Sequence, residues 1–95
     1  MGGRKLREIV EEETFERSRK KLKADPRQLD RALWAVTWAL ARDAERASVE
    51  VPGTVVRVIL TDPFPDVPAL AVFLTLTDDE VQLRWIEPEN ADAEG

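Results

Sequence analysis

Apolar residues recur at helical spacing in the first half of the chain. A helix turns about 100° per residue, so four residues of the segment 26–46 fall on one side of it: Leu29, Leu33, Val36 and Leu40. This stripe predicts a long helix with one core-facing side, with Asp25 as its N-cap and Pro26 in its first turn. A shorter helix is predicted over residues 15–24, with Thr14 as N-cap and a narrow inner face formed by Phe15, Ser18 and Leu22.

The second half of the chain alternates between apolar and other residues with the period of a β-strand. After the turn signal "VPG", strands are predicted over residues 55–61, 70–77 and 81–86, and a weaker alternation predicts a first strand over residues 5–12. In the last strand, three residues are expected to face the core: Val81, Leu83 and Trp85.

The predicted elements follow one another in the order β-α-α-β-β-β. Two successive helices can cover one face of a sheet whose last three strands form an antiparallel meander. The predicted fold is therefore an α+β two-layer sandwich, in which a helical hairpin packs on a mostly antiparallel four-stranded sheet. Residues 1–88 form a single domain in this interpretation, and the acidic residues 89–95 form a flexible tail.

Two tryptophans of the long helix lie away from its predicted core face. Trp34 and Trp38 are four residues apart, which makes them neighbours on the helix surface, and Arg31 and Arg42 border them. One interpretation is that the shorter helix folds back and covers them. The other is that they form a partner-binding surface, because Trp flanked by Arg is typical of interface anchors. The second interpretation predicts that at least Trp38 is exposed in the monomer.

The net charge of −5 conceals an uneven distribution along the chain. Residues 1–46 hold 12 Lys and Arg against 9 Asp and Glu, whereas residues 47–95 hold 2 against 10. The basic charge is concentrated in residues 17–31, which form either a solvated helix face or a surface for an acidic peptide. Duplex nucleic acid is not expected as a partner, because affinity for it comes largely from neutralising phosphates.

The chain lacks the side chains that usually carry catalysis at neutral pH, since it has no His, Cys or Tyr. It also lacks a glycine-rich phosphate loop and a calcium-loop spacing, so neither a cofactor nor a metal is expected. Two weak candidates, Arg57 and Arg84, are predicted on the open face of the sheet, where they either hold a phosphate or keep the face soluble. We therefore expect a protein that is not an enzyme.

Neither a membrane span nor a secretory signal is predicted. No apolar run approaches the roughly 18 residues of a membrane-spanning helix. The start, "MGGRKLREIVEEE", has no apolar segment of the kind found in signal peptides. A cytoplasmic protein without a membrane partner is expected.

Three segments in order resemble the RelE/ParE superfamily of toxins from type II toxin–antitoxin systems: "REIVEEETFERSRKKL", a helix that ends in "ALARD", and "VPGTVVRVILTDPFPDVPALAVFLTLTDDEVQLRWIEPE". The likeness covers about residues 5–88. It implies a small cytoplasmic protein that is neutralised by an antitoxin, whose extended C-terminal segment wraps it. RelE-like members cut mRNA in the ribosome with basic and Tyr or His side chains on the sheet face, whereas ParE-like members lack that set and act on DNA gyrase.

The chain departs from the nuclease pattern of this family. The family's second-strand Arg is matched by Arg57, but its third-strand Arg and Tyr are replaced by Ala71 and Leu74, and the C-terminus is acidic. We therefore expect a toxin-fold protein that acts by binding, with an antitoxin as partner and DNA gyrase as a candidate target. The alternatives are a non-toxic or engineered scaffold that self-associates through Trp34 and Trp38, and a ribosome-dependent mRNA endonuclease built on the two arginines.

Overall fold

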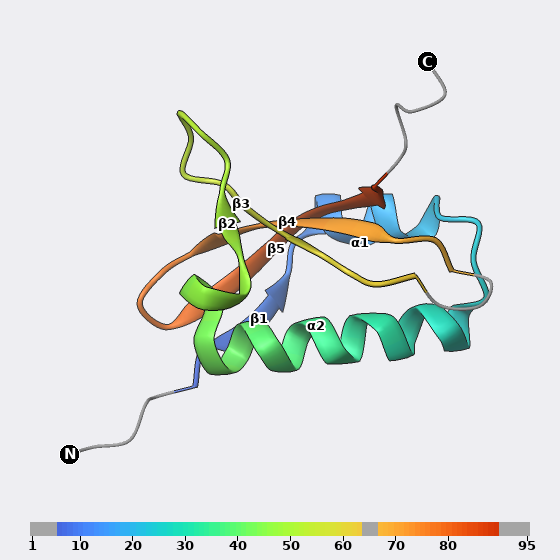
Figure 1. The fold of residues 1–95 in the computed structure, drawn as a ribbon, viewed down its shortest axis with the longest axis horizontal. Helices are drawn as coiled ribbons and strands as arrows, with labels where there is room; N and C mark the ends of the chain where they lie inside the picture. Colours follow the sequence, from blue (N-terminus) through green and yellow to red (C-terminus); the bar gives the residue numbers. More distant parts are fainter. Residues whose placement is uncertain (1–5, 64–66, 90–95) are drawn as a thin grey trace.

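The computed structural model describes residues 6–63 and 67–89, and it has two helices and five strands. In chain order these are β1 (Glu8–Glu11), α1 (Glu13–Lys20), α2 (Pro26–Ala47), β2 (Val49–Glu50), β3 (Arg57–Leu60), β4 (Leu70–Leu76) and β5 (Glu80–Pro88) (Figure 1). The predicted α+β class is confirmed. Most of the predicted acidic tail, residues 90–95, lies outside the described residues.

The strands form one mixed sheet in the order β1-β5-β4-β3-β2. β1 runs parallel to β5, while the other neighbouring strands are antiparallel. The prediction of a four-stranded sheet is wrong in this detail, because β2 follows α2 directly and adds a fifth strand beside β3. Two residues are too few to produce a pattern of alternation that sequence analysis could detect.

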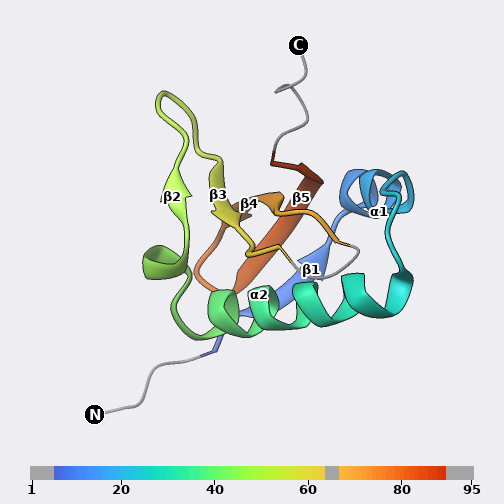
Figure 2. The ribbon, with the colours of Figure 1, turned by 45° about the vertical axis from the view of Figure 1, so that its right-hand side comes forward.

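α2 begins and packs as predicted. The side chain of Asp25 caps it, since its Oδ1 accepts a hydrogen bond from the N–H of Arg27 at 2.9 Å, and Pro26 occupies the first turn. The backbone departs from helical geometry at Asp43, near the C-terminal end. Figure 2 shows α2 running along one side of the strands. Its buried residues contain the whole predicted stripe: Leu29, Ala32, Leu33, Val36, Leu40 and Ala44.

α1 is shorter than predicted, and its N-terminus is built differently. Thr14 lies inside the helix instead of capping it, and its Oγ1 donates a hydrogen bond to the carbonyl of Arg84 at 2.6 Å. Phe15 and Ser18 are buried as predicted, and Leu22, which follows the helix, is partly buried against the same core. The two helices and the inner side of the sheet therefore share one hydrophobic core.

A β-bulge in β5 reverses the expected orientation of Trp85. The register between β4 and β5 shifts by one residue between Phe73 and Leu74, which leaves Arg84 as the extra residue on β5. Beyond the bulge, Ile86 is buried and Trp85 is 38% exposed on the opposite face. The prediction that Trp85 faces the core is therefore wrong. The other two predicted positions are buried: Val81 and Leu83.

Candidate functional site

Arg57 lies on the helix side of the sheet, and the prediction that it lies on the open face is wrong. It pairs with Leu74, which is fully buried in the core, and directly opposite residues of antiparallel strands share a face. Its Nε donates a hydrogen bond to Ser48 Oγ at 2.7 Å, and its Nη2 donates to the carbonyls of Glu45 at 3.0 Å and Ser48 at 2.9 Å. Because these carbonyls lie at the C-terminal end of α2, Arg57 acts as a cationic cap for the helix.

Arg84 lies on the open face, away from Arg57. Its Nε donates a hydrogen bond to Thr75 Oγ1 at 3.0 Å, and the Thr75 hydroxyl in turn donates to Gln82 Oε1 at 2.9 Å. The structure therefore does not bring the two predicted arginines together. Ala71 and Leu74, which occupy the positions of the family's Arg and Tyr, are both buried.

A charged cluster that was not predicted joins the residue before β1, the end of α2 and the turn after β4. The guanidinium of Arg7 donates two hydrogen bonds to the carboxylate of Glu45, at 3.0 and 2.9 Å, and its Nε donates to the carbonyl of Thr77 at 2.9 Å. The hydrogen bonds from Arg7 are the main cause that lowers the pKa of Glu45 to about 2. No sequence signal marks this pair, because 38 positions separate its members.

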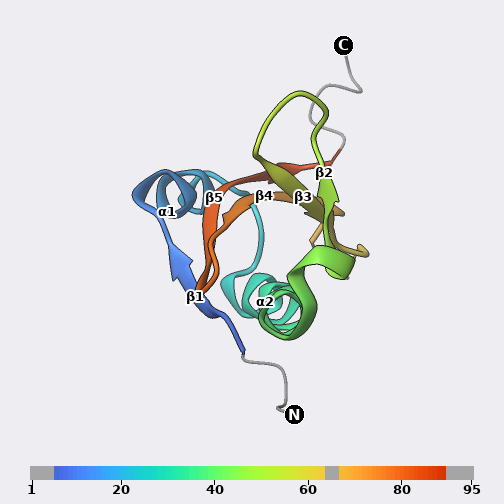
Figure 3. The ribbon, with the colours of Figure 1, turned by 90° about the vertical axis from the view of Figure 1, so that its left-hand side faces the viewer.

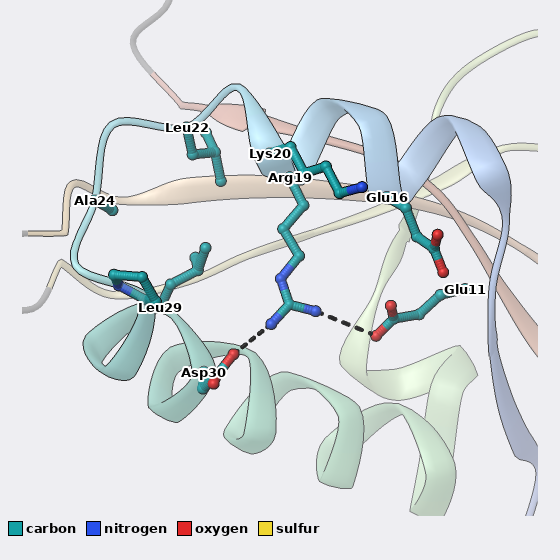
Figure 4. A pocket seen from close by; sticks show the side chains of 9 residues that line it. Glu11, Glu16, Arg19, Lys20, Leu22, Ala24, Leu29 and Asp30 are labelled. Carbon is teal, nitrogen blue, oxygen red and sulfur yellow. Dashed lines mark hydrogen bonds and ion pairs between the residues drawn. The ribbon is translucent and has the colours of Figure 1, made fainter.

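A second ion cluster connects α1 and α2 across a cavity of about 380 Å³ (Figure 4). The side chain of Arg19 crosses this space and forms ion pairs with Asp30 and, at 3.6 Å, with Glu11. Because two carboxylates already hold Arg19, it links the helices and does not offer a free cation to a ligand. The cluster also neutralises Asp30, which lies on the surface of α2.

The exposed side of α2 carries a surface that we name the Arg–Trp stripe. Trp34 and Trp38 are 66% and 47% exposed, so the predicted exposure of Trp38 is confirmed. Their rings meet edge to face, with centroids 6.0 Å apart and planes at 66°. With its arginines, the stripe consists of five residues at helical spacing: Arg27, Arg31, Trp34, Trp38 and Arg42.

The Arg–Trp stripe is positively charged, although the chain as a whole is acidic. Within residues 6–63 and 67–89, none of its three arginines takes part in an ion pair. Two acidic residues border the stripe on α2, and each forms an ion pair with an arginine outside this helix: Asp30 with Arg19, and Glu45 with Arg7. The stripe therefore presents two indole rings between uncompensated cations over about 22 Å of helix, at a rise of about 1.5 Å per residue.

None of the described helices is long and apolar enough to cross a membrane. The described part of the chain also contains no group of three His, Cys, Asp or Glu residues that could hold a metal ion. In comparisons with protein-family models, with curated proteins and with solved structures, no match to this chain was found. The resemblance to RelE/ParE toxins therefore rests on the sequence segments quoted above, and the function has to be argued from the surfaces of the molecule.

Proposed function

We propose that this chain is a protein-binding domain and that the Arg–Trp stripe is its binding surface. The observation that carries the proposal is the exposure of two neighbouring tryptophans, Trp34 and Trp38, on one helix. Tryptophan and arginine are the residues that most often dominate the energy of protein interfaces. Three arginines without an ion-pair partner among the described residues favour a partner segment that carries acidic groups beside apolar ones.

The more specific proposal, which rests on the sequence resemblance, is a RelE/ParE-like toxin that acts by binding. An antitoxin segment is then the neutralising partner, and DNA gyrase is the proposed target. The arrangement of the arginines argues against an mRNA endonuclease, because Arg57 is engaged at the end of α2 and Arg84 lies on the other face of the sheet. A non-toxic scaffold is the alternative to a toxin, and it uses the same stripe.

Induced expression in bacteria separates these alternatives. We expect the native chain to arrest growth without cleaving mRNA in a translation extract. The double variant Trp34→Ala, Trp38→Ala should lose the arrest. Arg17→Ala, which truncates an exposed arginine of α1 outside both proposed surfaces, is the control and should retain it. Both variants should remain folded, since truncation of exposed side chains usually changes stability by less than about 1 kcal/mol. Unimpaired growth with the native chain would favour the scaffold, and mRNA cleavage would favour the nuclease.

A further inference from the structure

A row of apolar side chains crosses the open face of the sheet. Val49, Val58, Phe73 and Trp85 are direct cross-strand partners on β2, β3, β4 and β5, so their side chains share this face. Val49 is 69% exposed, and Leu60, the next residue on this face of β3, is 54% exposed. The β-bulge at Arg84 is what brings Trp85 into the row. We name these five apolar residues the sheet-face row.

The sheet-face row is unusual for the outer side of a two-layer fold. Antiparallel sheets that face water normally carry polar residues on that side. Here α2 packs against the inner side, α1 lies along the edge of β5 beyond the end of β1, and no described helix lies over β2, β3 and β4 on the outer side (Figure 3). Phe73 lies on β4 between β3 and β5. Its partner Trp85 lies beyond the last β1–β5 pair, Glu11 with Leu83, so it stands toward the edge of the face that α1 borders. Large aromatic residues are typical of interface anchors.

The charges around the sheet-face row differ from those of the Arg–Trp stripe. Arg84 and Glu87 flank Trp85 along β5, so the face carries both signs, whereas the stripe carries cations alone. A surface with one sign of charge repels its own copy, but a surface with both signs can be complementary to itself. Extension of the sheet at the β2 edge is disfavoured, because β2 offers only two residues for pairing.

We propose that two copies of this chain associate face to face through the sheet-face row. The two-fold axis lies in the interface and runs across the strands near the Phe73–Trp85 pair, so the two β5 strands run antiparallel. This reversal brings Arg84 of one copy opposite Glu87 of the other. Two sheets packed in this way bury their apolar inner residues between them, as in a β-sandwich. The sheet-face row differs from the surface proposed for partner binding, so the dimer can be tested independently of the proposed function.

The oligomeric state of the full chain tests the proposal. Sedimentation equilibrium over a wide concentration range should show a monomer–dimer equilibrium. Trp85→Ala should raise the dimer dissociation constant by about 30-fold or more, as expected for a large aromatic anchor. Arg84→Glu and Glu87→Arg should each raise it by about tenfold, and the double variant should recover most of the affinity, because the exchanged charges again face each other.

Matched controls distinguish this surface from the Arg–Trp stripe. The variants Trp34→Ala and Trp38→Ala should leave the dimer dissociation constant unchanged. A chain that stays monomeric at all concentrations would overturn the proposal, and so would a dimer that depends on Trp34 and Trp38 but not on Trp85. The charge exchange also keeps the test valid if Trp85→Ala fails to fold. A double charge variant no better than the single variants would refute the antiparallel arrangement.

Discussion

Replacing Arg57 with Ala removes the side chain that holds the end of α2 against β3. Three hydrogen bonds to the end of α2 disappear, one to the hydroxyl of Ser48 and two to the carbonyls of Ser48 and Glu45, and so does the ion pair with Glu50 at 3.5 Å. The Arg57 side chain is only 16% exposed, so water can replace these bonds only in part. The favourable interaction of the cation with the negative end of the helix dipole is lost as well.

The magnitude of the effect follows from these contacts. A hydrogen bond to a charged group contributes about 1.5–3 kcal/mol, and the contribution of each bond falls when the bonds share one side chain near the surface. The interaction with the helix dipole adds about 0.3–1 kcal/mol. We expect Arg57→Ala to lower the free energy of unfolding by about 2–3 kcal/mol, which corresponds to roughly 10–20 °C in Tm for a domain of this size.

Equilibrium unfolding in urea, followed by tryptophan fluorescence, measures this change. The slope of the transition should stay constant while its midpoint falls, because the folded state is destabilised and not expanded. Arg17→Ala is the control, because Arg17 is 68% exposed and forms only a surface ion pair with Glu13 among the described residues; it should change stability by less than about 0.5 kcal/mol. An Arg57→Ala variant of native stability would refute the capping role. Loss of RNA cleavage in the same stable variant would restore Arg57 as a catalytic residue.

Three further predictions concern the charged cluster, a turn and the two sides of α2. Because Arg7 lowers the pKa of Glu45 from 4.5 to about 2, the ionised Glu45 stabilises the fold above about pH 4.5, and this contribution is lost as the pH falls toward 2. Glu45→Gln should therefore flatten the decline of the urea midpoint between pH 4.5 and 2. An equal decline in the native chain and the variant would contradict this prediction. Gly53 has a φ of 78° and no atom within 4 Å of an added Cβ, so Gly53→Ala should cost about 1–2 kcal/mol in thermal or urea unfolding through backbone strain alone. Leu40→Ala should cost about 2–5 kcal/mol because Leu40 is fully buried, whereas Trp38→Ala should cost less than about 1 kcal/mol; comparable losses in the two variants would show that Trp38 belongs to the core.

The helices could be predicted from the sequence because their periodicity is a local property. The spacing of the apolar residues in α2 fixes which side is buried, and it therefore also places Trp34 and Trp38 on the exposed side. The sheet was predicted less well because strand orientation depends on register with a neighbour. One extra residue at Arg84 turned Trp85 outward, and the pairing with Leu74 turned Arg57 toward the helices.

The electrostatics of the Arg–Trp stripe could be predicted only in part. Its arginines are visible in the sequence, but the neutralisation of Asp30 and Glu45 depends on Arg19 and Arg7, which are 11 and 38 positions away. Read from the sequence alone, these two acids would reduce the positive charge of the helix surface. The ion pairs with Arg19 and Arg7 neutralise these two carboxylates, so the stripe is more positively charged than the sequence of α2 alone suggests.

The two proposed surfaces point away from each other, and this has a consequence for binding. The Arg–Trp stripe lies on the side of α2 that faces away from the sheet, whereas the sheet-face row lies on the side of the sheet that faces away from α2. Association through the sheet-face row therefore leaves both stripes accessible, one on each outer side of the dimer. A partner that carries two acidic segments could then occupy both stripes, and the second contact would form at a high effective concentration. In this arrangement dimerisation strengthens partner binding without adding any contact to the stripe itself.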